Sequence, residues 1–340
     1  MKSKDFILFA TALCCCWSVQ AGTESGGYDR SKAKVKYQRP VSVPVPQNNP
    51  LTPERVELGK ALFFDPRLSG ANSIACASCH NPAFSWGDGL PKGVGHGSKE
   101  LGRRTPTILN VAFGELMFWD GRADSLEEQA LGPIKSPGEM NLPLGDLLGK
   151  LKGIPGYAPL FAKAYPGEGI SETTVAKAIA SYERTIISGT APFDEWVNGR
   201  EPAISDSAKR GFDLFNTKAN CAACHSGWNF TDNGFHDIGV TGDDPGRGKL
   251  LTEVAVLQNA FKTPTLRNAD HRAPYMHDGS EKSLTEVVEL YNAGGRVKRP
   301  SITSEVRPLG LTTEEKTDLC NFMLTLTSAD KPCEIPTLPH

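Results

Sequence analysis

Six residues that could do thiol and metal chemistry fall into two copies of one pattern, Cys76-Ala77-Ser78-Cys79-His80 and Cys221-Ala222-Ala223-Cys224-His225. Two thiols three positions apart, followed directly by histidine, form the attachment signature of c-type haem. Each thiol forms a thioether to one porphyrin vinyl group, and the adjacent histidine then lies under the iron as its proximal ligand. The two motifs therefore predict two covalent haems c.

Two other uses of paired cysteines explain the pattern less well. A zinc site could take four thiolates, but 145 positions separate Cys76 from Cys221, and zinc gives no reason for a histidine after each pair. A redox-active dithiol of the thioredoxin type lies within a βαβ unit, and the sequence around these cysteines does not predict such a unit. Haem attachment is the interpretation that uses all six residues.

The N-terminal segment predicts export. Lys2 and Lys4 precede an apolar run over residues 6–19, which is too short to span a bilayer comfortably, and a small-residue cleavage site ends at Ala21. Residues 1–21 are therefore interpreted as a signal peptide to the periplasm, with an uncleaved anchor or a lipoprotein as the alternative. Cleavage removes three of the nine cysteines, those at positions 14–16.

Two cysteines remain outside the motifs, Cys320 and Cys333. In an oxidising compartment they are expected to form a disulfide that closes a loop of about a dozen residues and adds roughly 2–3 kcal/mol of stability. The alternative is a pair of unrelated buried thiols.

The elements that must position these residues are mainly helices. The chain has 340 residues, with 34 glycines and 25 prolines, so we expect a loop-rich protein with little sheet. Capping residues and apolar periodicity predict helices after Thr52, after Ser171, over 206–215, over 283–291, and from Thr312 to Leu326. The formal net charge of −2 gives no support to a nucleic-acid partner.

The predicted organisation has four parts. After the signal, residues 22–50 form an N-terminal arm or linker. Its proline-rich stretch, which runs from Pro40 to Pro53, is predicted to be extended and poorly packed. Residues 51–195 form a first haem domain, and residues 196–340 form a second haem domain with a C-terminal tail.

Several further stretches resemble the bacterial dihaem cytochrome c peroxidase and MauG family. They run in matching order and spacing around both haem motifs: GVGHG (93–97), RRTPTILN (103–110), FWDGRADSLEEQALGPI (118–134), GEMN (138–141), FKTPTLRN (261–268) and APYMHDGS (273–280). The resemblance covers residues 51–326, nearly the whole mature chain. It implies two cytochrome-c-like α domains, with a peroxidatic haem in the first and an electron-relaying haem in the second.

The resemblance also implies roles for four residues around the first haem. Trp119 matches a tryptophan between the haems that can pass an electron, although core packing is its simpler use. Glu139 matches the acid that moves a proton between the peroxide oxygens. Gln129 matches an amide that holds peroxide or its water. His96 matches a loop histidine that ligates the peroxidatic iron in many relatives.

The second haem differs from that of the peroxidases proper, which carry a methionine ligand on the helix after HDG. Here Tyr291 stands at that position, as in MauG. A tyrosinate is a hard anionic donor that stabilises ferric and higher-valent iron. In those relatives the loop histidine leaves the peroxidatic iron only when the second haem is reduced. A second haem that is hard to reduce removes this trigger, so His96 is left as either a ligand or a non-ligating neighbour.

The family also binds Ca²⁺ between its domains. In this chain Arg104 stands at the asparagine ligand position, and Arg272 is near the carbonyl ligands. The backbone carbonyls of Arg272 and Pro274 could still hold the ion, so calcium is left as a possible cofactor. It is a doubtful one, because a guanidinium repels a cation and its charge can replace the ion.

These residues predict a periplasmic dihaem peroxidase that reduces hydrogen peroxide with electrons from a small donor protein, a cytochrome c or a cupredoxin. The alternative is a MauG-like enzyme that uses peroxide to oxidise residues of a partner protein, as in the maturation of a tryptophan-derived quinone. A dihaem electron-transfer cytochrome without peroxide chemistry is a third hypothesis, against which Glu139 and Gln129 argue. A homodimer is compatible with each.

Overall fold

The protein is mainly helical, as expected, in a computed structural model that describes residues 27–330 and 332–340. The predicted signal peptide lies outside the described residues. The two-stranded antiparallel sheet pairs β1 (Phe235–His236) with β2 (Phe261–Lys262). The helices are α1 (Arg30–Val35), α2 (Pro53–Phe64), α3 (Cys76–Cys79), α4 (Leu126–Lys135), α5 (Leu144–Lys152), α6 (Tyr157–Ala164), α7 (Glu172–Glu183), α8 (Pro192–Val197), α9 (Asp206–Asn216), α10 (Leu284–Ala293) and α11 (Thr313–Leu324). Among the described residues, none of these helices is long and apolar enough to cross a membrane.

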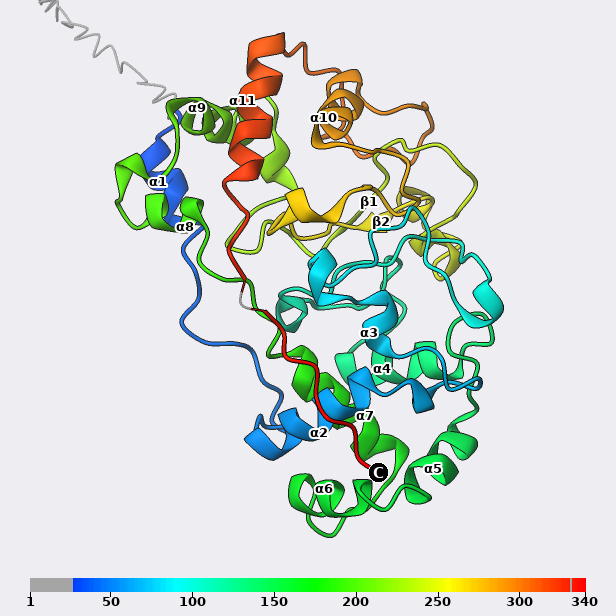
Figure 1. Ribbon diagram of the computed structural model, residues 1–340. Coiled ribbons are helices and arrows are strands. Elements are labelled where there is room, and N and C mark those ends of the chain that lie inside the picture. The colour runs from blue at the N-terminus through cyan, green and yellow to red at the C-terminus, as the bar shows by residue number, and fades with distance from the viewer. Residues whose placement is uncertain (1–26, 331) are drawn as a thin grey trace, which may run out of the picture.

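The chain forms two halves, each around its own hydrophobic core. Figure 1 shows the first half, with α2 to α7, below the second half, with α9, α10 and α11. The predicted helix starts are confirmed: Thr52 accepts a hydrogen bond from the backbone N–H of Arg55, and Thr312 and Glu315 form a reciprocal capping box.

One helix crossing is repeated in both halves. In the first, α2 packs on α7 so closely that a Cβ on Gly59 would lie 1.9 Å from the Ala178 carbonyl oxygen. In the second, α9 packs on α11, and a Cβ on Gly211 would lie 2.0 Å from the Asp318 carbonyl oxygen. Each glycine is therefore required by the crossing, and the two crossings give a common frame for comparing the halves.

Both ends of the described chain cross to the opposite half (Figure 1). Before its proline-rich stretch, the N-terminal arm buries Tyr37 in the aromatic core of the second half, because that core offers apolar surface to its ring. The proline-rich residues 40–50 form no helix or strand and are mostly exposed, as expected. Arg30 adds an ion pair to Asp213 on α9. At the other end, the backbone N–H of Gly156 donates to the His340 carbonyl oxygen at 2.8 Å. The two terminal segments therefore tie the halves together.

The expected disulfide is wrong. Cys320 and Cys333 are both free, because Cys320 is on α11 in the second half whereas Cys333 is on the tail that crosses to the first. There the Cys333 sulfur lies 3.5 Å from the Tyr182 hydroxyl. The spacing of the two cysteines in the sequence gave no sign that the tail crosses from the second half to the first.

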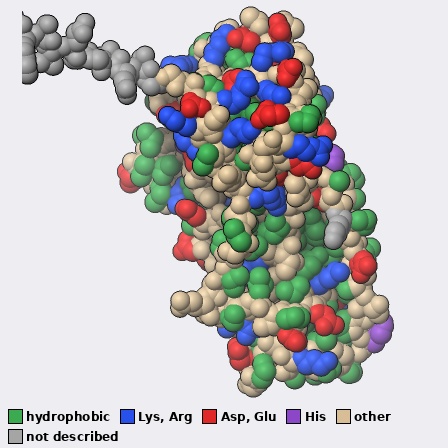
Figure 2. Space-filling view, turned by 90° about the vertical axis from the view of Figure 1, so that its left-hand side faces the viewer, with side chains coloured by type: hydrophobic (Ala, Val, Ile, Leu, Met, Phe, Trp, Pro, Cys, Tyr) green, Lys and Arg blue, Asp and Glu red, His purple; other side chains and the backbone are tan. Residues whose placement is uncertain are grey.

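Charged side chains of both signs are interspersed over the face drawn in Figure 2. Many of them are paired, among them Lys34 with Glu201 and Lys218 with Glu315. Exposed pairs of this kind contribute little stability individually.

Candidate haem sites and the cavity between them

One large cavity joins the two halves of the protein. Its volume is about 810 Å³, and its lining includes all four motif cysteines and both motif histidines. The rest of the wall comes from loops and from helices of both halves, and it is mostly apolar. A covalent haem placed at each motif would therefore lie in this shared space.

The motif histidines are oriented for iron. Nδ1 of His80 lies 3.2 Å from the Trp86 carbonyl oxygen, and Nδ1 of His225 lies 2.9 Å from the Phe230 carbonyl oxygen. If Nδ1 carries the proton and donates to the carbonyl, Nε2 is left free as a donor to a metal. Burial also lowers the pKa of both rings, which keeps them neutral. These residues fit a haem c in each half.

The motif thiols suit thioether formation better than binding of a metal by thiolates. Burial raises the pKa of Cys79 to about 11 and that of Cys221 to about 12, so both remain protonated at neutral pH. A zinc site would need thiolates close together, but Cys76 and Cys221 belong to different halves.

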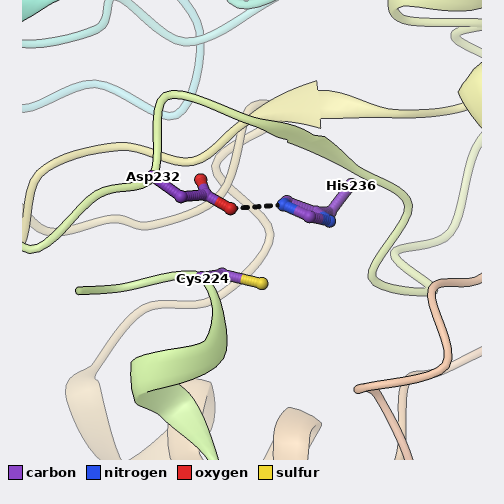
Figure 3. A group of neighbouring side chains, drawn as sticks. All are labelled: Cys224, Asp232 and His236. Carbon is purple, nitrogen blue, oxygen red and sulfur yellow. Dashed lines mark hydrogen bonds and ion pairs between the residues drawn. The ribbon is translucent and has the colours of Figure 1, made fainter.

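A second arrangement of ligand types lies beside the second motif. Cys224, Asp232 and His236 place one donor atom each within 4.8 Å of one another, and Figure 3 shows the Asp232 carboxylate bonded to the His236 ring above the Cys224 sulfur. The Asp232–His236 distance is 2.8 Å, and hydrogen bonding to Asp232 and to Cys224 raises the pKa of His236 to about 10. Because a thioether on Cys224 cannot act as a thiolate, only the Asp232–His236 ion pair remains once haem is attached.

Trp119 lies at the junction of the halves. It is buried, lines the cavity, and donates from its indole Nε1 to the Arg104 carbonyl oxygen at 2.8 Å. Its own carbonyl oxygen accepts a hydrogen bond from the backbone N–H of Lys262 in the second half. The ring is therefore fixed where the two haem spaces meet, as the resemblance implies.

Glu139 and Gln129 both line the cavity near the first motif. Each is partly exposed to this space, and in the described part of the chain neither side chain has a hydrogen bond or ion pair within the protein. The Glu139 carboxylate is close enough to Cys79 to raise the pKa of that thiol, together with burial and Asp88. Both side chains are therefore available to a ligand above the first haem.

His96 is held beside this group without entering the cavity. Its backbone N–H donates to the Gly138 and Glu139 carbonyl oxygens, at 3.1 and 2.8 Å. The preceding glycine is required here, because a Cβ on Gly95 would lie 2.0 Å from the Gly138 carbonyl oxygen. Among the described residues, Gly95 lines the cavity but His96 does not. In this structure His96 therefore positions the Glu139 loop through its backbone.

A repeat that the sequence analysis missed explains the difference between the haem sites. Gly121 and Gly279 both have positive φ, and Ser125 and Ser283 both cap the helix that follows, each pair being 158 positions apart. The same offset relates Pro133 on α4 to Tyr291 on α10, and both line the cavity. The repeated glycine and the helix-cap serine could have revealed Pro133.

This pair gives the two sites opposite character. Proline has no side-chain donor, so the first site is left without a protein ligand at the place where the second has a phenol. Burial, with the fields of Cys221 and Cys224, raises the pKa of Tyr291. A tyrosinate at this position therefore needs the compensating charge of a ferric iron.

The residues at the expected calcium site do not fit a cation. Arg104 and Arg272 are both buried, and Nη2 of Arg104 donates to the Arg272 carbonyl oxygen at 2.5 Å. Arg272 itself donates to the Thr265 carbonyl oxygen. Desolvation and the neighbouring Arg104 lower the pKa of Arg272 to about 9. The Arg104 guanidinium therefore already binds the Arg272 carbonyl oxygen that a calcium ion would need as a ligand.

The fold and the cavity define a dihaem c-type protein with two cytochrome-c-like domains. Comparison with known proteins agrees: residues 53–202 match the family described as di-haem cytochrome c peroxidase, and residues 208–327 match cytochrome c. The methylamine utilization protein MauG of Methylorubrum extorquens is 49% identical, with 96% of this chain and 93% of that protein covered. The cytochrome-c peroxidase IdrP1 of a Pseudomonas species is 36% identical, with 87% of each covered.

A solved structure is similar as well. It is described as a MauG-like protein associated with microbial copper homeostasis, is 29% identical, has a TM-score of 0.78, and is matched over 86% of this chain and 94% of its own. The chain belongs to the dihaem cytochrome c peroxidase and MauG family. It is an oxidoreductase that uses peroxide and carries two covalent haems c.

Proposed function

We propose that this chain is a MauG-like enzyme that uses peroxide to oxidise residues of a partner protein, in the maturation of a tryptophan-derived quinone cofactor. The observation that carries the proposal is the pair of Pro133 and Tyr291, which face one cavity from equivalent helix positions. When bound, the haems supply irons that react with peroxide and store its oxidising equivalents. Pro133 would offer no ligand to the haem of the first half, and Tyr291 would stabilise the higher oxidation states of the iron in the second half.

Glu139 and Gln129 perform the acid–base and binding work in this proposal. The free carboxylate of Glu139 would take a proton from one oxygen of a bound peroxide and deliver it to the other. Gln129 holds peroxide by its amide, because its side chain has no competing partner among the described residues. Trp119, fixed by Arg104, provides the route by which the two sites share oxidising equivalents.

The relatives favour a protein substrate over an electron donor. The chain shares more residues with MauG than with the peroxidase IdrP1, and its tyrosine is the MauG-like feature. This support is stronger than that for the peroxidase hypothesis that the sequence analysis put first. Reduction of peroxide with electrons from a small donor protein is kept as the second candidate, because the family includes peroxidases at 36% identity.

We also propose that the enzyme works in the periplasm. The charged start, the short apolar run and the cleavage pattern before Ala21 support this location. The four thioethers that hold the two haems are stable in an oxidising compartment, since their sulfurs can no longer form disulfides.

The test compares two substrates. The diferric protein and peroxide are supplied either with the precursor of a tryptophan-derived quinone subunit or with a reduced cytochrome c. We expect mass spectrometry to show oxygen insertion or cross-linking in the precursor, with slow turnover of the cytochrome. Rapid oxidation of the cytochrome and an unmodified precursor would instead establish the peroxidase function.

A further inference from the structure

A buried carboxylic acid without a partner faces the first haem space. Glu183 is the last residue of α7, is 4% exposed, and lines the cavity. Among the described residues, its Oε2 atom has no hydrogen-bond partner. Burying an unpaired acid costs stability, and nothing in the role of Glu139 or Gln129 calls for it.

The position equivalent to Glu183 in the second half is occupied by an apolar residue. Glu183 comes five residues after Ala178, whose carbonyl oxygen meets Gly59 at the helix crossing. Met323 comes five residues after Asp318, whose carbonyl oxygen meets Gly211 at the equivalent crossing. Met323 is also buried and also lines the cavity. The fold therefore accepts an apolar side chain here, and only the first half has an acid.

Apart from the charge of the haem, the surroundings of Glu183 favour the protonated form of its carboxyl. Burial raises the pKa of Glu183 to about 8, Arg184 on its own helix lowers it, and Glu127 on α4 raises it. Among the described residues, Arg184 and Glu127 are the charged groups that shift the pKa of Glu183. They form an ion pair with each other, with 2.8 Å between Arg184 Nη1 and Glu127 Oε1. Neither neutralises the acid directly.

The carboxyl is also close to the attachment point of the first haem. The field of Glu183 is, after burial, the largest influence that raises the pKa of the Cys76 thiol. Once Cys76 is a thioether it carries no charge, and a haem attached there would bring a charge that changes with oxidation state into the cavity that Glu183 lines. A unit change of charge in a poorly screened cavity shifts the pKa of a neighbouring carboxyl.

We propose that Glu183 is a redox-linked proton site of the first haem. When that haem gains one electron from a reductant, the Glu183 carboxylate takes up one proton from solvent to become the neutral acid. When the electron is withdrawn, the proton returns to solvent through the cavity. The inference goes beyond the proposed function, because it requires only the haem at Cys76, Cys79 and His80 and holds for either substrate.

The test follows the reduction potential of each haem spectroscopically between pH 6 and 9.5, under anaerobic conditions. For the wild type, the potential of the first haem is expected to fall with rising pH by up to 59 mV per unit, since one proton accompanies one electron. The Glu183→Gln and Glu183→Met variants should lose this slope and unfold at a higher temperature. The Met323→Glu variant is the matched control, and should confer a slope on the second haem.

A wild-type potential that does not change with pH would overturn the proposal, and so would an unchanged slope in Glu183→Gln. Haem content and circular dichroism establish that each variant is folded, and the methionine variant copies the side chain that the second half tolerates. The oxidation of a partner protein is measured separately. A failure of that activity with an intact pH slope would reject the proposed function and leave Glu183 as the proton site.

Discussion

Replacing Glu139 by glutamine tests the acid–base step at the first haem. The amide keeps the size of the side chain but cannot take and return a proton. General acid–base catalysis contributes about 10²–10⁴ in rate, so the bimolecular reaction with peroxide should slow by that factor, which corresponds to roughly 2.7–5.4 kcal/mol of activation free energy. Stopped-flow absorbance of the diferric protein mixed with peroxide measures this rate directly.

The structure predicts that this loss occurs without unfolding. The Glu139 side chain has no hydrogen bond or ion pair in the described part of the chain, and the loop is held by the backbone N–H of His96. The free energy of unfolding should therefore change by less than about 0.5 kcal/mol. Glu115→Gln, at an exposed carboxylate of the same half, is the control. A peroxide rate in Glu139→Gln equal to that of the control would remove Glu139 from the mechanism.

Three further predictions follow from the second haem, the junction and the charge pairs. Tyr291→Met should raise the potential of the second haem enough for mild reductants to reduce it, and an unchanged potential would argue against tyrosine ligation. EDTA should alter neither activity nor melting temperature, because Arg104 donates to the carbonyl that calcium would need; a loss restored by Ca²⁺ would contradict this. Hydrogen bonding to Arg103 lowers the pKa of Asp244 to about 2, so this pair stabilises the folded state above about pH 4 and the contribution is lost as pH falls from 4 to 2. Asp244→Asn should remove about 1–2 kcal/mol at pH 7 but little at pH 2, by urea unfolding, and an equal loss at both would reject the linkage.

The haem motifs could be predicted from sequence because the chemistry is local. Two thiols and a histidine must be adjacent to hold one porphyrin, and the same holds for helix starts such as Thr52 and Thr312, whose caps lie within one turn. The tyrosine was found because it stands at the position, on the helix after HDG, where the related peroxidases carry their methionine ligand.

What the sequence did not show depends on contacts between distant segments. The disulfide was wrong because the tail after α11 crosses to the first half and takes Cys333 to Tyr182. The packing of Tyr37 in the second half depends likewise on a non-local core. Glu183 follows an alanine-rich helical stretch and gives no local signal, since its burial is decided by the crossing at Gly59. Pro133 was visible in principle, through the 158-residue repeat that relates it to Tyr291.

The central claim is that an open first haem and a tyrosine-ligated second haem share the oxidising equivalents of peroxide. Adding one equivalent of peroxide to the diferric protein, and following both irons by Mössbauer and electron paramagnetic resonance spectroscopy, tests it most directly. The account predicts that both irons rise above the ferric state without prior reduction, and that the state is long-lived. Oxidation confined to the first iron, or a reaction only after the second is reduced, would contradict it.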